Sequence, residues 1–82
     1  MKVHVKVFPT AGLCDETKKV DIDLEEGNMS ELQLQLQEQL GASPHQIEGL
    51  MFLHNGFSLD KHKEVAFQDG DQLWLLPLLS GG

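Results

Sequence analysis

The sequence predicts an α+β fold in which a mixed sheet of four to five strands packs on one main helix. Two segments in the first part of the chain, 2–8 and 20–24, alternate apolar and polar residues, which is the pattern of half-buried strands, and apolar strand-like runs return in the second half. A segment between them is rich in Leu and Gln, which are helix formers. The length of 82 residues, with 40% apolar and 23% charged residues, suits one folded domain.

The first half of the chain begins with two strand patterns. Valines occupy every second position from 3 to 7 within the segment 2–8, with charged residues or His between them, so this segment is expected to be a strand. Residues 9–18 show no periodicity and are expected to form a loop. Apolar residues at 20, 22 and 24 then alternate with Asp21 and Asp23, which predicts a second strand.

Residues 31–40 fit two structures. Leucines at 32, 34 and 36 alternate with glutamines, as in a strand, but Asn28 with Glu31 fits a helix capping box and Gly41 stands where a helix would end. We therefore expect a helix, with a buried stripe of Met29, Leu32, Leu36 and Leu40. Ser43 before Pro44 predicts a second, short helical turn.

The second half contains a hairpin and a last strand. The apolar run over 50–59 is interrupted by Asn55-Gly56, a dipeptide typical of tight hairpin turns. A turn at 69–71 precedes a strand over 73–76, and Pro77 is expected to release the chain from the sheet. The order is strand, strand, helix, strand, strand, with a short return strand after the hairpin. This predicts a domain over residues 1–77 and a flexible tail over 78–82.

Charge and cysteine content restrict the partners and the compartment. Thirteen acidic against six basic residues give a net charge of -7, which repels nucleic acid and anionic membranes and steers the domain toward a basic face of another protein. Cys14 has no second cysteine to pair with, and the first residues lack the apolar run of a secretory signal, so we expect a cytoplasmic protein. The longest apolar run, 73–79, is too short to span a bilayer.

The sequence ends in Ser80-Gly81-Gly82, and this ending has two interpretations. Chain ends are often disordered, so the two glycines could be idle. Glycine also lacks a Cβ atom, so such an end can enter a narrow channel and present its carboxylate unhindered to a nucleotide phosphate. The second interpretation makes the Gly82 carboxylate a site of activation by a partner enzyme.

The last fourteen residues carry a family resemblance. The segment 69–82, Asp-Gly-Asp-Gln-Leu-Trp-Leu-Leu-Pro-Leu-Leu-Ser-Gly-Gly, resembles the ending of MoaD-type and ThiS-type sulfur carriers, which share the ubiquitin-like β-grasp fold. The Asn55-Gly56 hairpin also resembles theirs, while the first half agrees in element order only. Pro77 stands where MoaD-like tails have the first of two prolines and Leu78 where they have the second, which makes MoaD the nearer relative.

The resemblance implies a carrier protein that is not itself an enzyme and binds no cofactor. A partner adenylyltransferase resembling ubiquitin-activating enzymes would use ATP to adenylate Gly82, and a sulfur donor would convert the acyl adenylate to a thiocarboxylate. The sulfur acceptor would be molybdopterin, through the large subunit of a synthase, or thiazole or another metabolite. Attachment to protein lysines would instead make the chain a modifier, and an idle tail would leave a binding module.

A second candidate site lies on the sheet. If the last strand alternates, its leucines at 73 and 75 face the helix and its other large residues face the open side. The open side would then carry a patch of Met51, Leu53, Trp74 and Leu76. Such patches are usually binding sites, so we expect this one to bind the activating enzyme and the acceptor, together with Pro77, Leu78 and Leu79. The alternative is a core buried on both sheet faces.

The remaining polar residues point to no reaction. Asp21 and Asp23 share a strand face and are interpreted as solvated rather than as an acid–base pair. The four histidines lack the short spacings of zinc ligands, so no metal is expected. Cys14 is a reactive thiol near two lysines or an incidental cysteine. The mixed-charge segment 60–64 is expected to be solvated, although its lysines could receive a conjugate.

Overall fold

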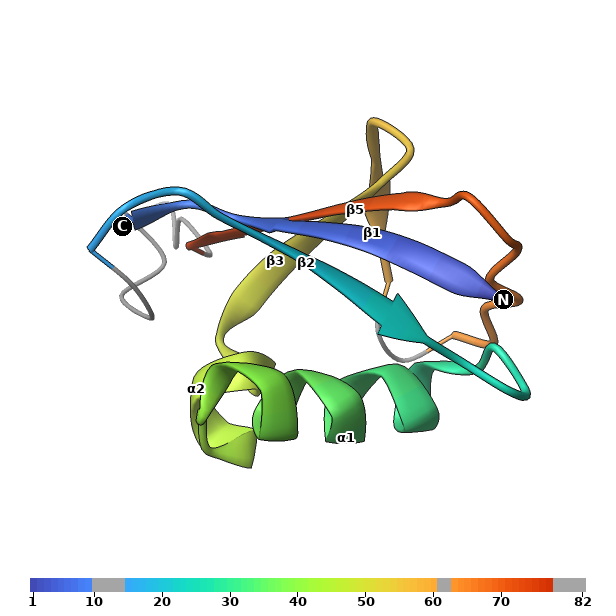
Figure 1. The fold of residues 1–82 in the computed structure, drawn as a ribbon, viewed down its shortest axis with the longest axis horizontal. Helices are drawn as coiled ribbons and strands as arrows, with labels where there is room; N and C mark the ends of the chain where they lie inside the picture. The colour runs from blue at the N-terminus through green and yellow to red at the C-terminus, as the bar shows by residue number, and fades with distance from the viewer. Residues whose placement is uncertain (10–14, 61–62, 78–82) are drawn as a thin grey trace.

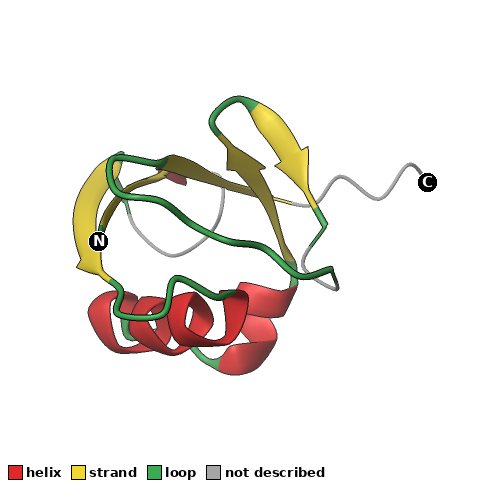
Figure 2. Ribbon diagram, turned by 90° about the vertical axis from the view of Figure 1, so that its right-hand side faces the viewer, coloured by secondary structure: helices red, strands yellow, loops and turns green. Residues whose placement is uncertain are grey.

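The computed structural model describes residues 1–9, 15–60 and 63–77. One sheet of five strands, in the order β2-β1-β5-β3-β4, is covered on one face by two helices (Figures 1 and 2). β1 and β5 are parallel and the other neighbouring strands are antiparallel, so the predicted α+β fold with a mixed sheet is confirmed. The elements are β1 (Lys2–Val7), β2 (Lys18–Asp23), α1 (Met29–Leu40), α2 (Pro44–Glu48), β3 (Leu50–His54), β4 (Phe57–Leu59) and β5 (Gln72–Pro77).

The core lies between the sheet and the helices. Every second residue of β1 and β5 points into it, so the three valines of β1 and the leucines at 73 and 75 are at most 1% exposed. Leu32 and Leu36 of α1 meet them from the other side, while Leu40 is only partly buried against this core. β2 begins at Lys18, earlier than expected, because Lys18 still pairs with Val7 of β1.

Residues 29–40 form a helix, so the strand alternative is wrong. The Asn28 side chain accepts a hydrogen bond of 2.8 Å from the Glu31 amide, and Gly41 ends the helix with a left-handed φ of 64°. Leu34, which a strand pattern would place beside Leu32 and Leu36, is 62% exposed. The helical period therefore decides which leucines are buried.

The capping box at this helix differs from the expected form. The Glu31 carboxylate accepts hydrogen bonds from the amides of Glu25, Glu26 and Gly27, at 2.7, 3.0 and 3.0 Å. These bonds, first of all the one from Glu25, hold the pKa of Glu31 below its usual value. Glu31 thus fixes the turn before the helix, whereas at α2 Ser43 and Gln46 form the complete reciprocal box.

The β3–β4 hairpin turns at Asn55-Gly56 as predicted. The two residues have φ angles of 51° and 89°, the positive values that a tight turn of this kind requires at both central positions. The turn directs β4 back along β3, with Phe57 opposite His54.

The last strand extends one residue further than expected: Pro77, which was expected to release the chain from the sheet, is still part of β5 and pairs with Leu50 of β3. The oxygens of Asp71 and Leu75 accept hydrogen bonds from β1 and the adjoining Phe8, while the oxygen of Gln72 faces the β3 side. Successive residues of a strand direct their backbone N–H and C=O groups to alternate sides, so the nitrogen of Pro77 faces the β1 side. On that side β1 has already ended at Val7. A proline fits there because no partner needs its missing N–H.

Candidate functional site

The two predicted sites differ in how far the structure describes them. Residues 78–82, which include Leu78, Leu79, Ser80, Gly81 and Gly82, lie outside the described residues, as does Cys14. The tail and the domain boundary at residue 77 therefore stay predictions. The predicted sheet patch, by contrast, lies wholly within the described strands β3 and β5.

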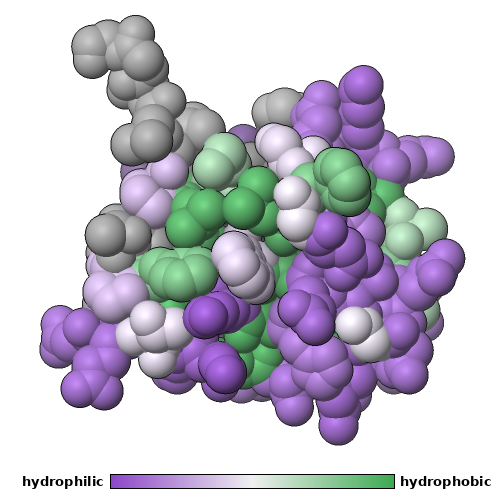
Figure 3. All heavy atoms as spheres, turned by 90° about the horizontal axis from the view of Figure 1, so that it is seen from above, coloured by the Kyte–Doolittle hydropathy of each residue, from purple (hydrophilic) through white to green (hydrophobic). Residues whose placement is uncertain are grey.

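The four patch residues form two cross-strand pairs on the sheet face opposite the helices. Leu53 lies opposite Trp74, and Met51 lies opposite Leu76. Trp74 is 40% exposed and the other three are partly buried. Figure 3, a view onto this face, shows hydrophobic groups gathered beside a broad hydrophilic area. None of the four is buried, so the alternative of a core on both faces is not what the structure has.

Two residues that the sequence did not assign to the patch complete it. Phe8 packs edge-on against Trp74, with ring centroids 5.5 Å apart. The Nζ atom of Lys6 lies 5.2 Å from the Phe8 ring centroid and 5.3 Å from that of Trp74, within cation–π distance. We call these three residues the aromatic cluster. Parallel pairing of β1 with β5 creates it, by placing Lys6 beside Trp74.

A polar network fixes the start of β5 beside the hairpin turn. The Asp71 carboxylate accepts hydrogen bonds from the His54 ring at 2.7 Å, from the Gln68 amide at 2.9 Å and from the Asn55 side chain at 3.1 Å. Asn55 in turn accepts a bond of 2.8 Å from the Gln72 amide. These contacts join β3 to the start of β5, two to three residues before Trp74.

The electrostatics of this network favour an ionised carboxylate. Burial raises the pKa of Asp71, but the hydrogen bonds from Gln68, His54 and Asn55 together outweigh burial and hold the pKa below its usual value. The His54 ring also packs edge-on against Phe67, at 5.1 Å between centroids. The network therefore stabilises the strand pairing on which the open face depends.

No group of three or more metal-ligating side chains occurs among the described residues, and none of their helices is long and apolar enough to cross a membrane. His4 bonds Asp21 at 2.7 Å on the exposed sheet face, where Asp23 is also exposed.

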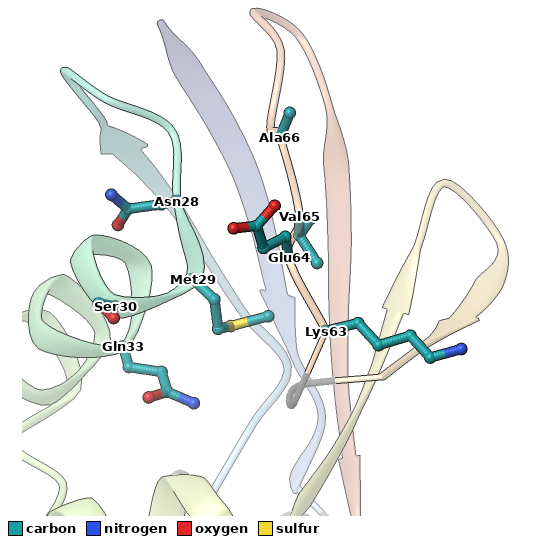
Figure 4. Close-up of a pocket in the computed structure, with 8 residues that line it drawn as sticks. All are labelled: Asn28, Met29, Ser30, Gln33, Lys63, Glu64, Val65 and Ala66. Carbon is teal, nitrogen blue, oxygen red and sulfur yellow. The ribbon is translucent and has the colours of Figure 1, made fainter.

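A hollow with a volume of about 580 Å³ lies between the start of α1 and residues 63–66. Its lining side chains come from these two segments, and Figure 4 shows Lys63 extending away from the helix. Its titratable lining residues are Lys63 and Glu64, which are neighbours in the chain, and none of its lining residues on α1 is titratable. The open face and the tail thus remain the candidate sites.

The fold is that of ubiquitin-like β-grasp proteins, with a five-stranded mixed sheet over a main helix. Two solved structures of this fold cover all of this chain and are covered fully by it. SAMP1 from Haloferax volcanii, a small archaeal modifier, has a TM-score of 0.74 at 21% identity. A chain from the complex of subunits 1 and 2 of molybdopterin-converting factor from Helicobacter pylori has a TM-score of 0.60 at 24% identity.

A third similar structure is the HVO 2177 protein of Haloferax volcanii, with a TM-score of 0.60 at 19% identity over all of this chain and 87% of that protein. Neither the protein-family models nor the curated proteins give a match to the sequence. At these sequence identities the similarity establishes that the chain has the β-grasp fold. The functions of these proteins can be considered for this chain only as proposals.

Proposed function

We propose that this chain is a sulfur carrier whose reacting group is the carboxylate of Gly82. One observation carries the proposal: the β-grasp fold, shared over the full length with a chain of a molybdopterin-converting factor complex, occurs here with a sequence that ends in Gly81-Gly82. The fold supplies a rigid domain with an exposed apolar face, and the two glycines supply an unhindered carboxylate.

The reaction has two steps on a partner enzyme. The Gly82 carboxylate attacks the α-phosphate of ATP, forming an acyl adenylate and releasing pyrophosphate. A sulfur donor then attacks the acyl carbon, and AMP leaves with the bonding electrons. With hydrosulfide as the simplest donor, the products are the thiocarboxylate, AMP and a proton. The chain is therefore the substrate of an activating enzyme and not an enzyme itself.

The open face serves as the docking surface for this partner. Trp74 is a large, partly exposed aromatic residue with apolar neighbours, which is the usual composition of an energetically dominant contact. Five residues follow Pro77, the last of them Gly82, and an extended segment of this length spans at most roughly 18 Å. A partner bound at the end of β5 thus has the Gly82 carboxylate within reach of its nucleotide site.

The acceptor of the sulfur is proposed to be molybdopterin, in the cytoplasm, through a complex with the large subunit of a synthase. The similar chain from Helicobacter pylori comes from a complex of two subunits, which supports a subunit partner. A thiazole pathway of the ThiS type would use the same activated terminus with a different acceptor.

Conjugation to protein lysines is a second candidate function, because SAMP1 is also similar over the full length. A modifier shares the adenylation step but meets an amine instead of a sulfur donor. In a binding module with an idle tail, neither step would occur.

Intact mass spectrometry tests these possibilities. The protein is incubated with ATP, a MoaD-type or ThiS-type activating enzyme and a sulfide donor. The expected result is a mass gain equal to the replacement of one oxygen by sulfur. A mass increase linked to lysine would favour the modifier, and an unchanged mass with several such enzymes would refute the carrier proposal.

Two variants locate the reaction at the terminus. Deletion of Gly81 and Gly82 is expected to abolish the mass gain, and Gly82→Ala is expected to block activation. Both should leave the melting temperature almost unchanged, because residues 78–82 are predicted to form a tail outside the folded domain. A truncated protein that still gained sulfur would place the reacting group elsewhere.

A further inference from the structure

One row of side chains crosses the open face from a cationic end on β2 to the edge strand β4. The strand register places Lys19, Lys6, Trp74, Leu53 and Ser58 side by side on the five strands. Trp74 and Leu53 of the patch occupy the middle of this row, and the two lysines stand at its β2 end. The cationic end is therefore continuous with the proposed docking surface.

The two lysines break the charge pattern of their own strand pair. On the same face, the neighbouring rungs of β1 and β2 place a lysine opposite an aspartate and His4 opposite Asp21. Lys6, however, lies directly opposite Lys19. Like charges at directly opposite positions destabilise an antiparallel pair. When a sequence departs from such a pairing rule and the fold gains no stability from the departure, the position is expected mainly to be a functional one.

No carboxylate of the described chain neutralises this pair. Asp21, the nearest acidic rung, is hydrogen-bonded to His4 at 2.7 Å. Among residues 1–9, 15–60 and 63–77, neither Lys6 nor Lys19 makes an ion pair. In a chain with a net charge of -7, two adjacent cations without a carboxylate partner mark a site for an anion from outside.

The space for such an anion is present. A hollow of about 340 Å³ lies on this face and is lined by His4, Val5, Lys6, Lys19, Asp21, Gln72 and Trp74. Its one carboxylate, that of Asp21, is hydrogen-bonded to His4. The Lys6 ammonium lies between two rings of the aromatic cluster, at 5.2 and 5.3 Å from their centroids. A side chain held in this way loses less conformational freedom when it binds a ligand.

We propose that the Lys6–Lys19 hollow receives the carboxylate of an Asp or Glu side chain of the protein that docks on the open face. The inference rests on the docking part of the proposed function, and it does not depend on the chemistry at Gly82. Nucleic acid is disfavoured by the net charge, and a free phosphate would have no use for the adjoining Trp74 and Leu53. The partner surface is thus basic overall, with one acidic residue that fixes its orientation.

A peptide titration followed by NMR tests the inference without any partner enzyme. The probe is acetyl-Glu-Leu-amide, and its neutral counterpart is acetyl-Gln-Leu-amide. We expect saturable shifts of the Lys6 and Lys19 side chains and of the Trp74 indole, with binding of the Gln peptide roughly two- to fivefold weaker, the fold-change of an exposed ion pair.

The matched variants are Lys19→Gln and Lys18→Gln. Both remove one charge from β2, but Lys18 is opposite Val7 and so belongs to the other face of the strand. Lys19→Gln is expected to weaken binding of the Glu peptide roughly two- to fivefold, and Lys18→Gln to leave it unchanged. Equal binding of the two peptides, equal loss in the two variants, or tighter binding of inorganic phosphate at the same lysines would overturn the proposal.

A second measurement connects the site to activation. In ATP–pyrophosphate exchange with the activating enzyme, Lys19→Gln is expected to raise the KM for the carrier roughly two- to fivefold at unchanged kcat, with a smaller effect at high salt. Absence of exchange with the unsubstituted chain would refute the sulfur-carrier proposal alone. A normal KM for Lys19→Gln would refute the carboxylate contact alone.

Discussion

The two faces of the sheet are built from the same strands but differ in almost every property. Toward the helices, the side chains of β1 and β5 are aliphatic and at most 1% exposed. Toward the open side, the same two strands present lysines, His4 and Trp74, and Phe8 follows directly after β1. Because neighbouring residues of a strand point to opposite faces, a residue that stabilises the core is followed directly by one that can contact a partner. Variants at adjacent positions can therefore test this separation.

The largest expected effect is on the helix-covered face. Leu75→Ala removes a completely buried side chain and is expected to lower the free energy of unfolding by about 2–5 kcal/mol, as buried Leu→Ala changes do. Urea unfolding followed by circular dichroism measures the change. Leu76→Ala is the matched control on the same strand, and we expect it to cost less than about 1 kcal/mol. Equal losses would mean that the open face is also part of the core.

A second variant tests recognition on the open face. Trp74→Ala is expected to raise the KM of the activating enzyme for the carrier at least roughly tenfold, because aromatic anchors often contribute more than about 2 kcal/mol to binding. ATP–pyrophosphate exchange gives both kcat and KM. The control is Phe57→Ala, since Phe57 is 79% exposed but lies on β4 outside the patch. If both variants raised the KM equally, recognition by the activating enzyme would depend on the exposure of an aromatic residue and not on its position in the patch.

A smaller effect is expected at the network that joins the two strands of the patch. Asp71→Asn replaces the carboxylate bonded to His54 and Gln68 and is expected to cost about 1–2 kcal/mol at neutral pH. The folded-state pKa of Asp71 lies below the unfolded value of about 3.9, so its contribution is present above that pH. It is lost as the pH falls through the folded-state pKa.

Denaturation curves between neutral pH and the acid range measure this dependence. The Asn variant should show a shallower loss of stability with acid than the unsubstituted chain. Asp23→Asn, on an exposed rung of β2, is the control, because it removes one carboxylate without touching the Asp71 network. A variant slope equal to that of the parent chain would show that Asp71 contributes nothing to the pH dependence.

Local patterns in the sequence predicted most of the fold. The alternating valines of β1, the Asn55-Gly56 turn and the helix signals at Asn28 and Gly41 each depend on a few neighbouring residues. All four features were found where expected, although the Glu31 carboxylate caps the amides of the turn before the helix and not that of Asn28 itself. Pro77 was misplaced because a proline is normally a strand breaker. Its fit depends on where β1 ends, which is a property of the folded sheet.

The candidate site was predicted in part for the same reason. Alternation along β3 and β5 gave the patch, because the residues of each pair belong to one antiparallel unit. The pairing of β1 with β5 joins Lys6 to Trp74 across most of the chain, and no local pattern indicates it. Lys6 and Phe8 were therefore missed. The sequence did contain one signal for Phe8: it is an apolar residue that follows Val7 directly, so it falls on the otherwise polar face of the strand pattern.

β5 lies at the centre of the sheet, hydrogen-bonded to β1 on one side and to β3 on the other, and it is the element from which the chain continues toward Gly82. A pull on the C-terminal segment therefore acts along β5 and loads both ladders in shear. The hydrogen bonds of β5 to β1 and to β3 then carry the force at the same time and do not break one after another. A partner that drew the terminus into a channel would meet mechanical resistance from the whole sheet, and the domain would remain folded while its end was held.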